Sequence, residues 1–209
     1  MAEPIFKGMN TTDLLQQIAF IKEIDKLKYI QRRTKLFHSD RHENDAEHSW
    51  HLAMMTLVLA EHSDRPIEVL KVVKMVLIHD LVEIDAGDTF IYDTSKNHSN
   101  TDAERLAAIR IFGLLPQAQA QDFIQLWEEF EEGKTDEAKF ARTMDRFEPL
   151  LQNFSNNGGT WAEFNVDYQT VYNKKKAIKN GSATIWSYAE ELLKESIEKG
   201  ILKKDTTLL

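Results

Sequence analysis

Residues 69–83 read VLKVVKMVLIHDLVE and predict a strongly apolar helix that ends on chemically active side chains. Pro66 suits the first turn of this helix, because the fixed φ angle of proline is helical and its missing N–H is not needed there. The helix leads to the pair His79-Asp80, which offers a neutral nitrogen and an anionic oxygen to a divalent metal. Its apolar residues recur at three- and four-residue steps, as one helix face requires: Val69, Val72, Val73, Val76 and Leu77.

Helical spacing continues on both sides of this stretch. Apolar residues from Leu14 to Ile30 predict a first helix over residues 12–33. Asn44 and Glu47 fit a capping box, which starts a second helix near residue 45 and carries it to about residue 61. Residues 83–99 lack a clear repeat and contain Gly87, so we interpret them as a functional loop. Further helices are expected over residues 101–112, 116–132, 136–154, 161–176 and 184–199.

Composition agrees with an all-α fold. The chain has 209 residues with only 8 Gly and 4 Pro, about half the usual share of roughly 12%. Turns and β-corners use these residues for special backbone angles, so their scarcity disfavours sandwiches and barrels. No internal repeat or long linker divides the sequence. We therefore expect one helical domain over residues 1–209, with a motif-bearing core at about residues 12–155 and C-terminal helices at residues 160–199 packed on it.

Charge and cysteine content exclude several classes of function. With no Cys, the chain cannot form a disulfide, a thiolate zinc site or a cysteine nucleophile, so any metal must be held by His, Asp and Glu. A net charge of −8 disfavours a nucleic-acid polymer as partner. The N-terminal residues show no signal peptide, and no apolar run approaches the roughly 20 residues that span a bilayer. We expect a cytoplasmic protein that does not bind membranes.

The chemistry that remains lies in a set of His and Asp residues. The chain has no P-loop, dinucleotide fingerprint, G-x-S-x-G elbow or H-E-x-x-H motif. His79-Asp80 alone is weak support, because about half an occurrence per chain is expected by chance, and a core histidine beside a helix-end aspartate is the alternative. His48 lies in the first turn of the preceding helix. Asp145 adjoins an apolar helix face, where a carboxylate needs a metal or an ion pair with Arg142 or Arg146.

Two further acidic residues are candidates for roles beside a metal. Glu83 follows His79 by four residues and shares its helix face if the helix continues, which suits a general acid or base better than a further ligand. Asp88 follows Gly87 and could contact a substrate hydroxyl. The alternatives are a solvent-facing Glu83 and a turn-forming Asp88.

The ordered set of motifs resembles the HD-domain metal-dependent phosphohydrolases. The motifs are Glu47-His48-Ser49, His79-Asp80-x-x-Glu83, Gly87-Asp88-Thr89 and Asp145-Arg146. Within that family, residues 27–34 (LKYIQRRT) and 43–49 (ENDAEHS) are similar to the branch of bacterial and eukaryotic 5′-deoxynucleotidases. The resemblance covers about residues 21–152. It implies an HD-type helical bundle that hydrolyses a phosphomonoester, plausibly a 5′-deoxynucleoside monophosphate.

The resemblance also implies roles for individual residues. The metal ligands fall on His48, His79, Asp80 and Asp145, which would hold one divalent ion of the group Mn, Co, Mg, Zn, Ni or Fe. Glu83 and Asp88 fall in the catalytic or substrate-contacting shell. The phosphate-binding arginine matches Arg33, although the neighbouring Arg32 leaves the register open, and Thr34 follows where deoxynucleotidases often have Trp. Lys96 is a second candidate phosphate contact, and a solvated loop lysine is the more common alternative. Family members are often dimers, so a homodimer is implied.

Two other functions are compatible with the sequence. The same site could hydrolyse another nucleotide: a phosphodiester, a triphosphate or an alarmone. Alternatively, the chain could be a helical interaction protein without activity, in which aromatic side chains form an oligomer surface; at helical spacing, such side chains are more often core. Metal content and a phosphate-release screen separate these hypotheses.

Overall fold

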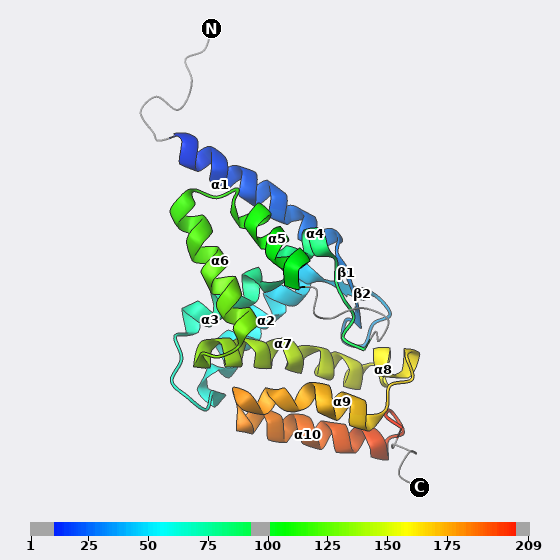
Figure 1. Cartoon of the computed structure of the whole chain (residues 1–209). Helices are drawn as coiled ribbons and strands as arrows, with labels where there is room; N and C mark the ends of the chain where they lie inside the picture. The colour runs from blue at the N-terminus through cyan, green and yellow to red at the C-terminus, as the bar shows by residue number, and fades with distance from the viewer. Residues whose placement is uncertain (1–10, 93–100, 204–209) are drawn as a thin grey trace.

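The protein is described by a computed structural model that covers residues 11–92 and 101–203. It is an all-α fold with one small two-stranded sheet, as Figure 1 shows. The expected all-α class is thereby confirmed. The larger helices are α1 (Thr11–Ile24), α2 (Asp45–Leu59), α3 (Val69–Ile78), α5 (Thr101–Phe112), α6 (Gln117–Glu132), α7 (Asp136–Ser155), α9 (Tyr168–Lys175) and α10 (Ala183–Glu198). Shorter elements are β1 (Gln31–Lys35), β2 (His42–Asn44), α4 (Glu83–Ala86) and α8 (Gly159–Glu163).

The first helix is shorter than the sequence predicts. α1 ends at Ile24, a 3₁₀ turn covers Asp25–Tyr29, and Gln31–Lys35 is the strand β1 rather than helix. β1 pairs antiparallel with β2, with Gln31 opposite Asn44. The expected helix over residues 12–33 is therefore wrong from Asp25 onward. The apolar spacing ends at Ile30, and pairing with a strand that lies further along the chain decides the local structure of Gln31–Lys35.

α2 begins as the sequence predicts. Asn44 Oδ1 accepts a hydrogen bond from the Glu47 amide at 3.0 Å, and Glu47 Oε2 accepts one from the Asn44 amide at 3.2 Å. This is the capping box, which satisfies free amides at both ends of the first turn. It fixes the start of α2 at Asp45, and so places His48 in that first turn.

Two other predicted helices need correction. α3 starts at Val69, so Pro66 lies ahead of the helix and not in its first turn. The predicted helix over residues 161–176 is broken: α8 ends at Glu163 and α9 starts at Tyr168, where Asp167 caps the new helix through its side chain. Part of the predicted loop is also helical, since α4 covers Glu83–Ala86 before Gly87 at φ +75°.

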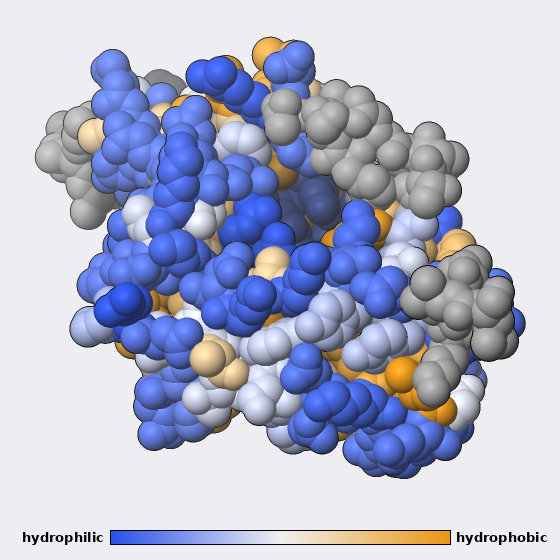
Figure 2. All heavy atoms as spheres, turned by 60° about the horizontal axis from the view of Figure 1, so that its bottom comes forward, coloured by the Kyte–Doolittle hydropathy of each residue, from blue (hydrophilic) through white to orange (hydrophobic). Residues whose placement is uncertain are grey.

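α7 lies at the centre of the arrangement. In Figure 1 it separates α9 and α10, on one side, from α2, α3 and α6 on the other. The main apolar core gathers around it, with fully buried side chains from α2, α3, α7 and α10. A second core joins α1, α5 and α6 to the end of α3. The face shown in Figure 2 is largely hydrophilic and is hollowed near its upper centre. Among the described helices, none combines the length and apolar character that crossing a bilayer requires.

Candidate metal centre

The four predicted ligands come from three segments that meet beside the core. His48 is carried by the first turn of α2, and Asp145 lies in the middle of α7. His79 and Asp80 lie in a 3₁₀ turn, His79–Val82, that continues α3. A 3₁₀ turn is tighter than an α-helix, so it redirects the side chains that follow the long apolar helix. The structure therefore brings together residues that are up to 97 positions apart in the chain.

The four side chains meet at short distances. His48 Nε2 lies 3.3 Å from Asp145 Oδ1, and His79 Nε2 lies 3.8 Å from the same oxygen. Asp80 brings Oδ1 to 3.0 Å from His79 Nε2 and Oδ2 to 4.0 Å from His48 Nε2. His48, His79 and Asp145 each offer a ligand atom within 4.8 Å of the others. Two nitrogens and several carboxylate oxygens thus face one point.

The outer nitrogen, Nδ1, of each histidine faces a partner in the protein, and this orients Nε2 toward the proposed metal position. His79 Nδ1 lies 2.9 Å from the backbone oxygen of Val76. A carbonyl oxygen can only accept, so Nδ1 carries the proton and the free lone pair of a neutral ring is on Nε2. His48 Nδ1 similarly faces the carboxylates of Glu148 and Glu43, at 3.3 and 3.5 Å. Such outer contacts fix the tautomer of metal-binding histidines. The donor set fits a divalent ion of the hard or borderline class.

The charges of the site are strongly coupled. Burial lowers the pKa of His79, but the carboxylates of Asp80 and Asp145 outweigh burial and raise that pKa to about 9. Burial would raise the pKa of Asp145, yet its contacts with His48 and His79 hold that pKa well below its usual value. Without a metal, His79 therefore holds its second proton to higher pH than a free imidazole does. A cation that binds here replaces that proton, as is general for histidine sites.

An outer ring of buried carboxylates supports His48. Glu148 Oε1 lies 3.3 Å from His51 Nδ1 while its other oxygen faces His48. Gln152 donates a hydrogen bond of 2.8 Å to Glu43. Sequence reasoning missed Glu148, although it follows Asp145 by three positions and so lies near it on α7. That spacing, on a helix that also carries an apolar face, is the signal that could have identified it.

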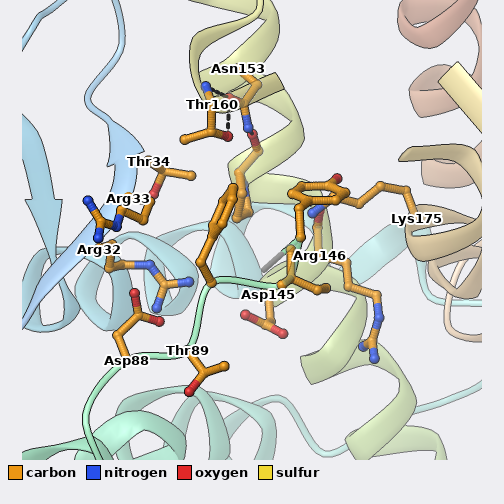
Figure 3. Close-up of a pocket in the computed structure, with 14 residues that line it drawn as sticks. Arg32, Arg33, Thr34, Asp88, Thr89, Asp145, Arg146, Asn153, Thr160 and Lys175 are labelled. Atoms are coloured by element: carbon orange, nitrogen blue, oxygen red, sulfur yellow. Dashed lines mark hydrogen bonds between the residues drawn. The ribbon is translucent and has the colours of Figure 1, made fainter. Parts of the chain in front are cut away.

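Arg32, and not Arg33, extends into the centre of the site. Arg32 Nη1 lies 2.9 Å from Asp80 Oδ2 and 3.3 Å from Asp45 Oδ1. Burial would lower the pKa of Arg32, but Asp80 and other nearby carboxylates raise it well above its usual value. In Figure 3 the Arg32 guanidinium points toward Asp88 and Asp145, whereas that of Arg33 points away from them. Arg33 lies at the rim of the same cavity, and its side chain is exposed.

Glu83 lies beside Asp80 at the start of α4. The predicted continuation of the helix holds in outline, because α4 follows the 3₁₀ turn directly. Asp45, Asp80 and Glu83 each bring an oxygen within 4.8 Å of the others. Burial, together with the charges of Asp80 and Asp45, raises the pKa of Glu83 well above its usual value. A raised pKa brings a carboxyl group closer to the range in which it can exchange a proton with a water or a substrate.

A cavity of about 90 Å³ opens beside Arg32 and Asp145, and Asp145 is the one of the four predicted ligands that lines it. Asp88 lies at this cavity, as do Asp145, the hydroxyl-bearing Thr34 and the buried Lys175. Phe90 and Tyr92 supply aromatic surface from the segment after Gly87. Sequence reasoning did not identify Lys175, which stands in a run of three lysines. Lys96 and the end of the predicted loop lie outside the described residues.

Comparison with a known family gives one match over most of the chain. The family described as HD domain matches residues 24–186, which include all four predicted metal ligands.

Relatives with assigned activities are similar over about two thirds of the chain. A 5′-deoxynucleotidase of Dictyostelium discoideum is 30% identical over 65% of this chain and 74% of its own length. A human 5′-deoxynucleotidase is 29% identical over 70% of each chain.

Solved structures agree with this grouping. A protein of Magnetospirillum magnetotacticum MS-1, described as a predicted metal-dependent phosphohydrolase, is 46% identical and has a TM-score of 0.86. The match covers 91% of this chain and 98% of that chain. A protein of Pyrococcus horikoshii OT3 shares the fold at 23% identity, with a TM-score of 0.61 over 87% of this chain and 99% of that chain.

Proposed function

The chain belongs to the HD domain family, and from this premise we propose that it is a metal-dependent phosphohydrolase that removes phosphate from 5′-deoxynucleoside monophosphates. The observation that carries the proposal is the convergence of His48 Nε2 and His79 Nε2 on the carboxylates of Asp80 and Asp145. One divalent ion bound by these four residues would lower the pKa of a bound water and polarise a phosphoryl oxygen.

Residues around the proposed ligands have complementary tasks. Glu83, with its raised pKa, takes a proton from the attacking water and delivers one to the leaving oxygen. Arg32 takes the role that the resemblance implies for Arg33. Its planar guanidinium reaches the centre of the site, where it can neutralise two phosphate oxygens at once. Asp88 accepts a hydrogen bond from a sugar hydroxyl.

A substitution pair distinguishes the two arginines. Arg33→Met is expected to leave the KM for a deoxynucleotide within about threefold of wild type, because the side chain points away from the site. Arg32→Lys keeps a positive charge but loses the forked geometry, so a loss of kcat/KM of roughly tenfold or more is expected. A large loss of kcat/KM in Arg33→Met, with little change in Arg32→Lys, would assign the phosphate contact to Arg33.

A phosphate-release screen tests the function directly. Purified protein is assayed for free phosphate with ribo- and deoxyribonucleoside monophosphates, and for nucleotide products by chromatography with a phosphodiester, a triphosphate and an alarmone, each with Mn²⁺, Co²⁺ or Mg²⁺. We expect turnover of deoxynucleoside monophosphates that is abolished in His79→Ala and unchanged in the matched variant His62→Ala. Turnover confined to a diester, triphosphate or alarmone would overturn the substrate assignment. A protein that neither binds metal nor releases phosphate would overturn the enzyme assignment.

We also propose a homodimer located in the cytoplasm. The lack of Cys supports a reducing compartment, and an exposed apolar stripe on α2 supports self-association. The stripe comprises Trp50, Met54, Leu57 and Val58. Light scattering during size-exclusion chromatography should give about twice the chain mass of 24.2 kDa, and cell fractionation tests the compartment.

A further inference from the structure

Helix α7 continues from Asp136 to Ser155, but its series of backbone hydrogen bonds is interrupted close to the aspartate that it contributes to the site. Pro149 lies inside α7, four residues after Asp145. Proline has no backbone N–H, so the carbonyl of Asp145 lacks its usual helical donor, and the proline ring crowds that same carbonyl. The turn that presents Asp145 therefore receives less support from the backbone than its neighbours do.

Side chains hold the carbonyl groups on either side of this interruption. Arg146 Nη1 donates to the carbonyl of Arg142 at 3.0 Å, and Asn153 Nδ2 donates to that of Pro149 at 2.8 Å. The carbonyl of Arg146, next to Asp145, accepts a hydrogen bond of 2.8 Å from Lys175 Nζ. Of these donors, Lys175 is the one that comes from another helix, α9.

The buried position of the Lys175 ammonium group is energetically unfavourable. The Lys175 side chain is 3% exposed, whereas the neighbouring Lys174 and Lys176 are exposed. Burial of an ammonium group is unfavourable unless an anion or several acceptors compensate it. Burial accordingly lowers the pKa of Lys175 to about 8, against the opposing influence of Asp145. The charge of Lys175 therefore lies within electrostatic reach of the Asp145 carboxylate.

We propose that Lys175 is a positioning residue for the metal centre: it fixes the proline-interrupted turn of α7 through the Arg146 carbonyl, and so holds the Asp145 carboxylate in place for the ion. This role rests on the proposed function of the site. It joins α9, a C-terminal helix that carries none of the predicted site residues, to the chemistry of the centre. Lys175 also lines the cavity in Figure 3, so direct contact with substrate is the competing role.

Metal binding and kinetics separate the two roles. Mn²⁺ affinity of the full-length protein is measured by calorimetry, together with kcat and KM for a deoxynucleoside monophosphate. Lys175→Met should weaken Mn²⁺ binding by about tenfold to 100-fold, the usual range for groups that orient a metal ligand. At saturating Mn²⁺, kcat should fall and KM should stay within about threefold. Lys175→Arg should restore most of the affinity, and Lys174→Met and Lys176→Met should match wild type.

Each contrary result overturns the proposal in a recognisable way. Unchanged Mn²⁺ affinity in Lys175→Met, with a raised KM, would make Lys175 a substrate contact. An equal loss of Mn²⁺ affinity in Lys174→Met would mean that any lysine charge in this segment has the same effect, and so would exclude a specific role for Lys175. If Lys175→Met does not fold, Lys175→Gln is measured instead: its shorter amide should reach the Arg146 carbonyl poorly and weaken Mn²⁺ binding, and wild-type Mn²⁺ affinity with a raised KM in that variant would overturn the proposal. Because calorimetry needs no substrate, a failure of the deoxynucleotidase assignment would leave the Mn²⁺ comparison intact.

Discussion

At the scale of single residues, Glu148 connects two histidines of unequal exposure. Its carboxylate lies 3.3 Å from Nδ1 of the buried His48 and 3.3 Å from Nδ1 of the half-buried His51. Burial alone would raise the pKa of Glu148, but these two rings lower it to about 2. The carboxylate therefore remains ionised and keeps a proton on His48 Nδ1, which leaves Nε2 for the predicted metal position.

Substitution of Glu148 by Gln removes this charge and preserves the side-chain shape. Glu148→Gln should weaken divalent metal binding by about tenfold or more, because the neutral amide no longer favours the required tautomer of His48. Isothermal calorimetry with Mn²⁺ measures the effect. Glu191→Gln, on the exposed face of α10, is the matched control and should bind Mn²⁺ as wild type does. Equal affinity of the two variants would contradict this role of Glu148.

The second prediction concerns the pH dependence of stability. The pKa of Lys175 is about 8 in the folded protein and 10.5 as the ordinary reference. Between these values the unfolded chain binds more protons than the folded chain, so this group makes the folded state more stable as pH rises. The free energy of unfolding of metal-free wild type, minus that of Lys175→Met, should rise by up to about 3 kcal/mol from pH 7 to pH 10.

Urea unfolding at several pH values measures that difference. Subtracting the variant cancels groups that titrate in both proteins, including His79, whose raised pKa acts in the opposite direction. If the difference in the free energy of unfolding falls as pH rises, folding raises the pKa of Lys175 and does not lower it, which would contradict this prediction.

At the scale of elements, the capping box is the point where helix formation and the site meet. His48 lies three residues after the first residue of α2, so the start of that helix fixes the direction of its imidazole. Shifting the start by one residue would turn the side chain by about 100° around the helix axis. The two reciprocal hydrogen bonds of Asn44 and Glu47 oppose such a shift.

The third prediction tests the capping box. Asn44→Ala should cost about 1 kcal/mol of stability, which corresponds to a decrease in Tm of roughly 2–4 °C for a chain of this size. Mn²⁺ affinity should fall in the same variant. Asn44→Asp keeps a capping oxygen and should retain most of both properties. Differential scanning calorimetry with and without Mn²⁺ measures them, and a loss of the same size in Asn44→Asp would contradict the capping role.

Local signals predicted some elements accurately and missed others for a physical reason. The helix over residues 101–112 was predicted at its observed bounds, and Asn44 started α2 where expected, because both depend on neighbours in sequence. The first three residues of β1 were predicted as helix, because the partner strand lies further along the chain. The choice between Arg32 and Arg33 likewise depends on Asp80, 48 residues beyond Arg32. The resemblance matched Arg33 and left the neighbouring Arg32 open, and no local pattern could reveal the contact of Arg32 with Asp80.

At the scale of the whole molecule, α7 is shared by the site and the C-terminal helices. Thr143 Oγ1 donates a hydrogen bond to the carbonyl of Ile178 at 3.0 Å, and that carbonyl belongs to the turn between α9 and α10. Gly181, just after this turn, lies very close to α7. An added Cβ would lie 2.6 Å from Thr143 Oγ1 and 2.7 Å from the Lys139 carbonyl oxygen. The C-terminal helices thus pack on α7 with no space for a methyl group.

The fourth prediction uses this close approach. Gly181→Ala should destabilise the protein by roughly 1–3 kcal/mol, the usual cost of overpacking, because a backbone carbonyl cannot move aside easily. Chemical denaturation measures the loss. Lys179→Ala, in the same turn but exposed, is the control and should change stability by less than about 0.5 kcal/mol. A silent Gly181→Ala would show that α7 and the C-terminal helices are less tightly joined.

The separation of His48 and Asp145 along the chain has a consequence for the unfolded state. An ion held by both residues closes a loop of 97 positions in a protein that has no Cys and can form no disulfide. A covalent link of that span would restrict the unfolded ensemble by roughly 4–5 kcal/mol in the chain-entropy description. A coordinated metal would act as a reversible cross-link of similar reach. A chelator would then make the protein more susceptible to proteolysis, whereas a reductant would have no such effect.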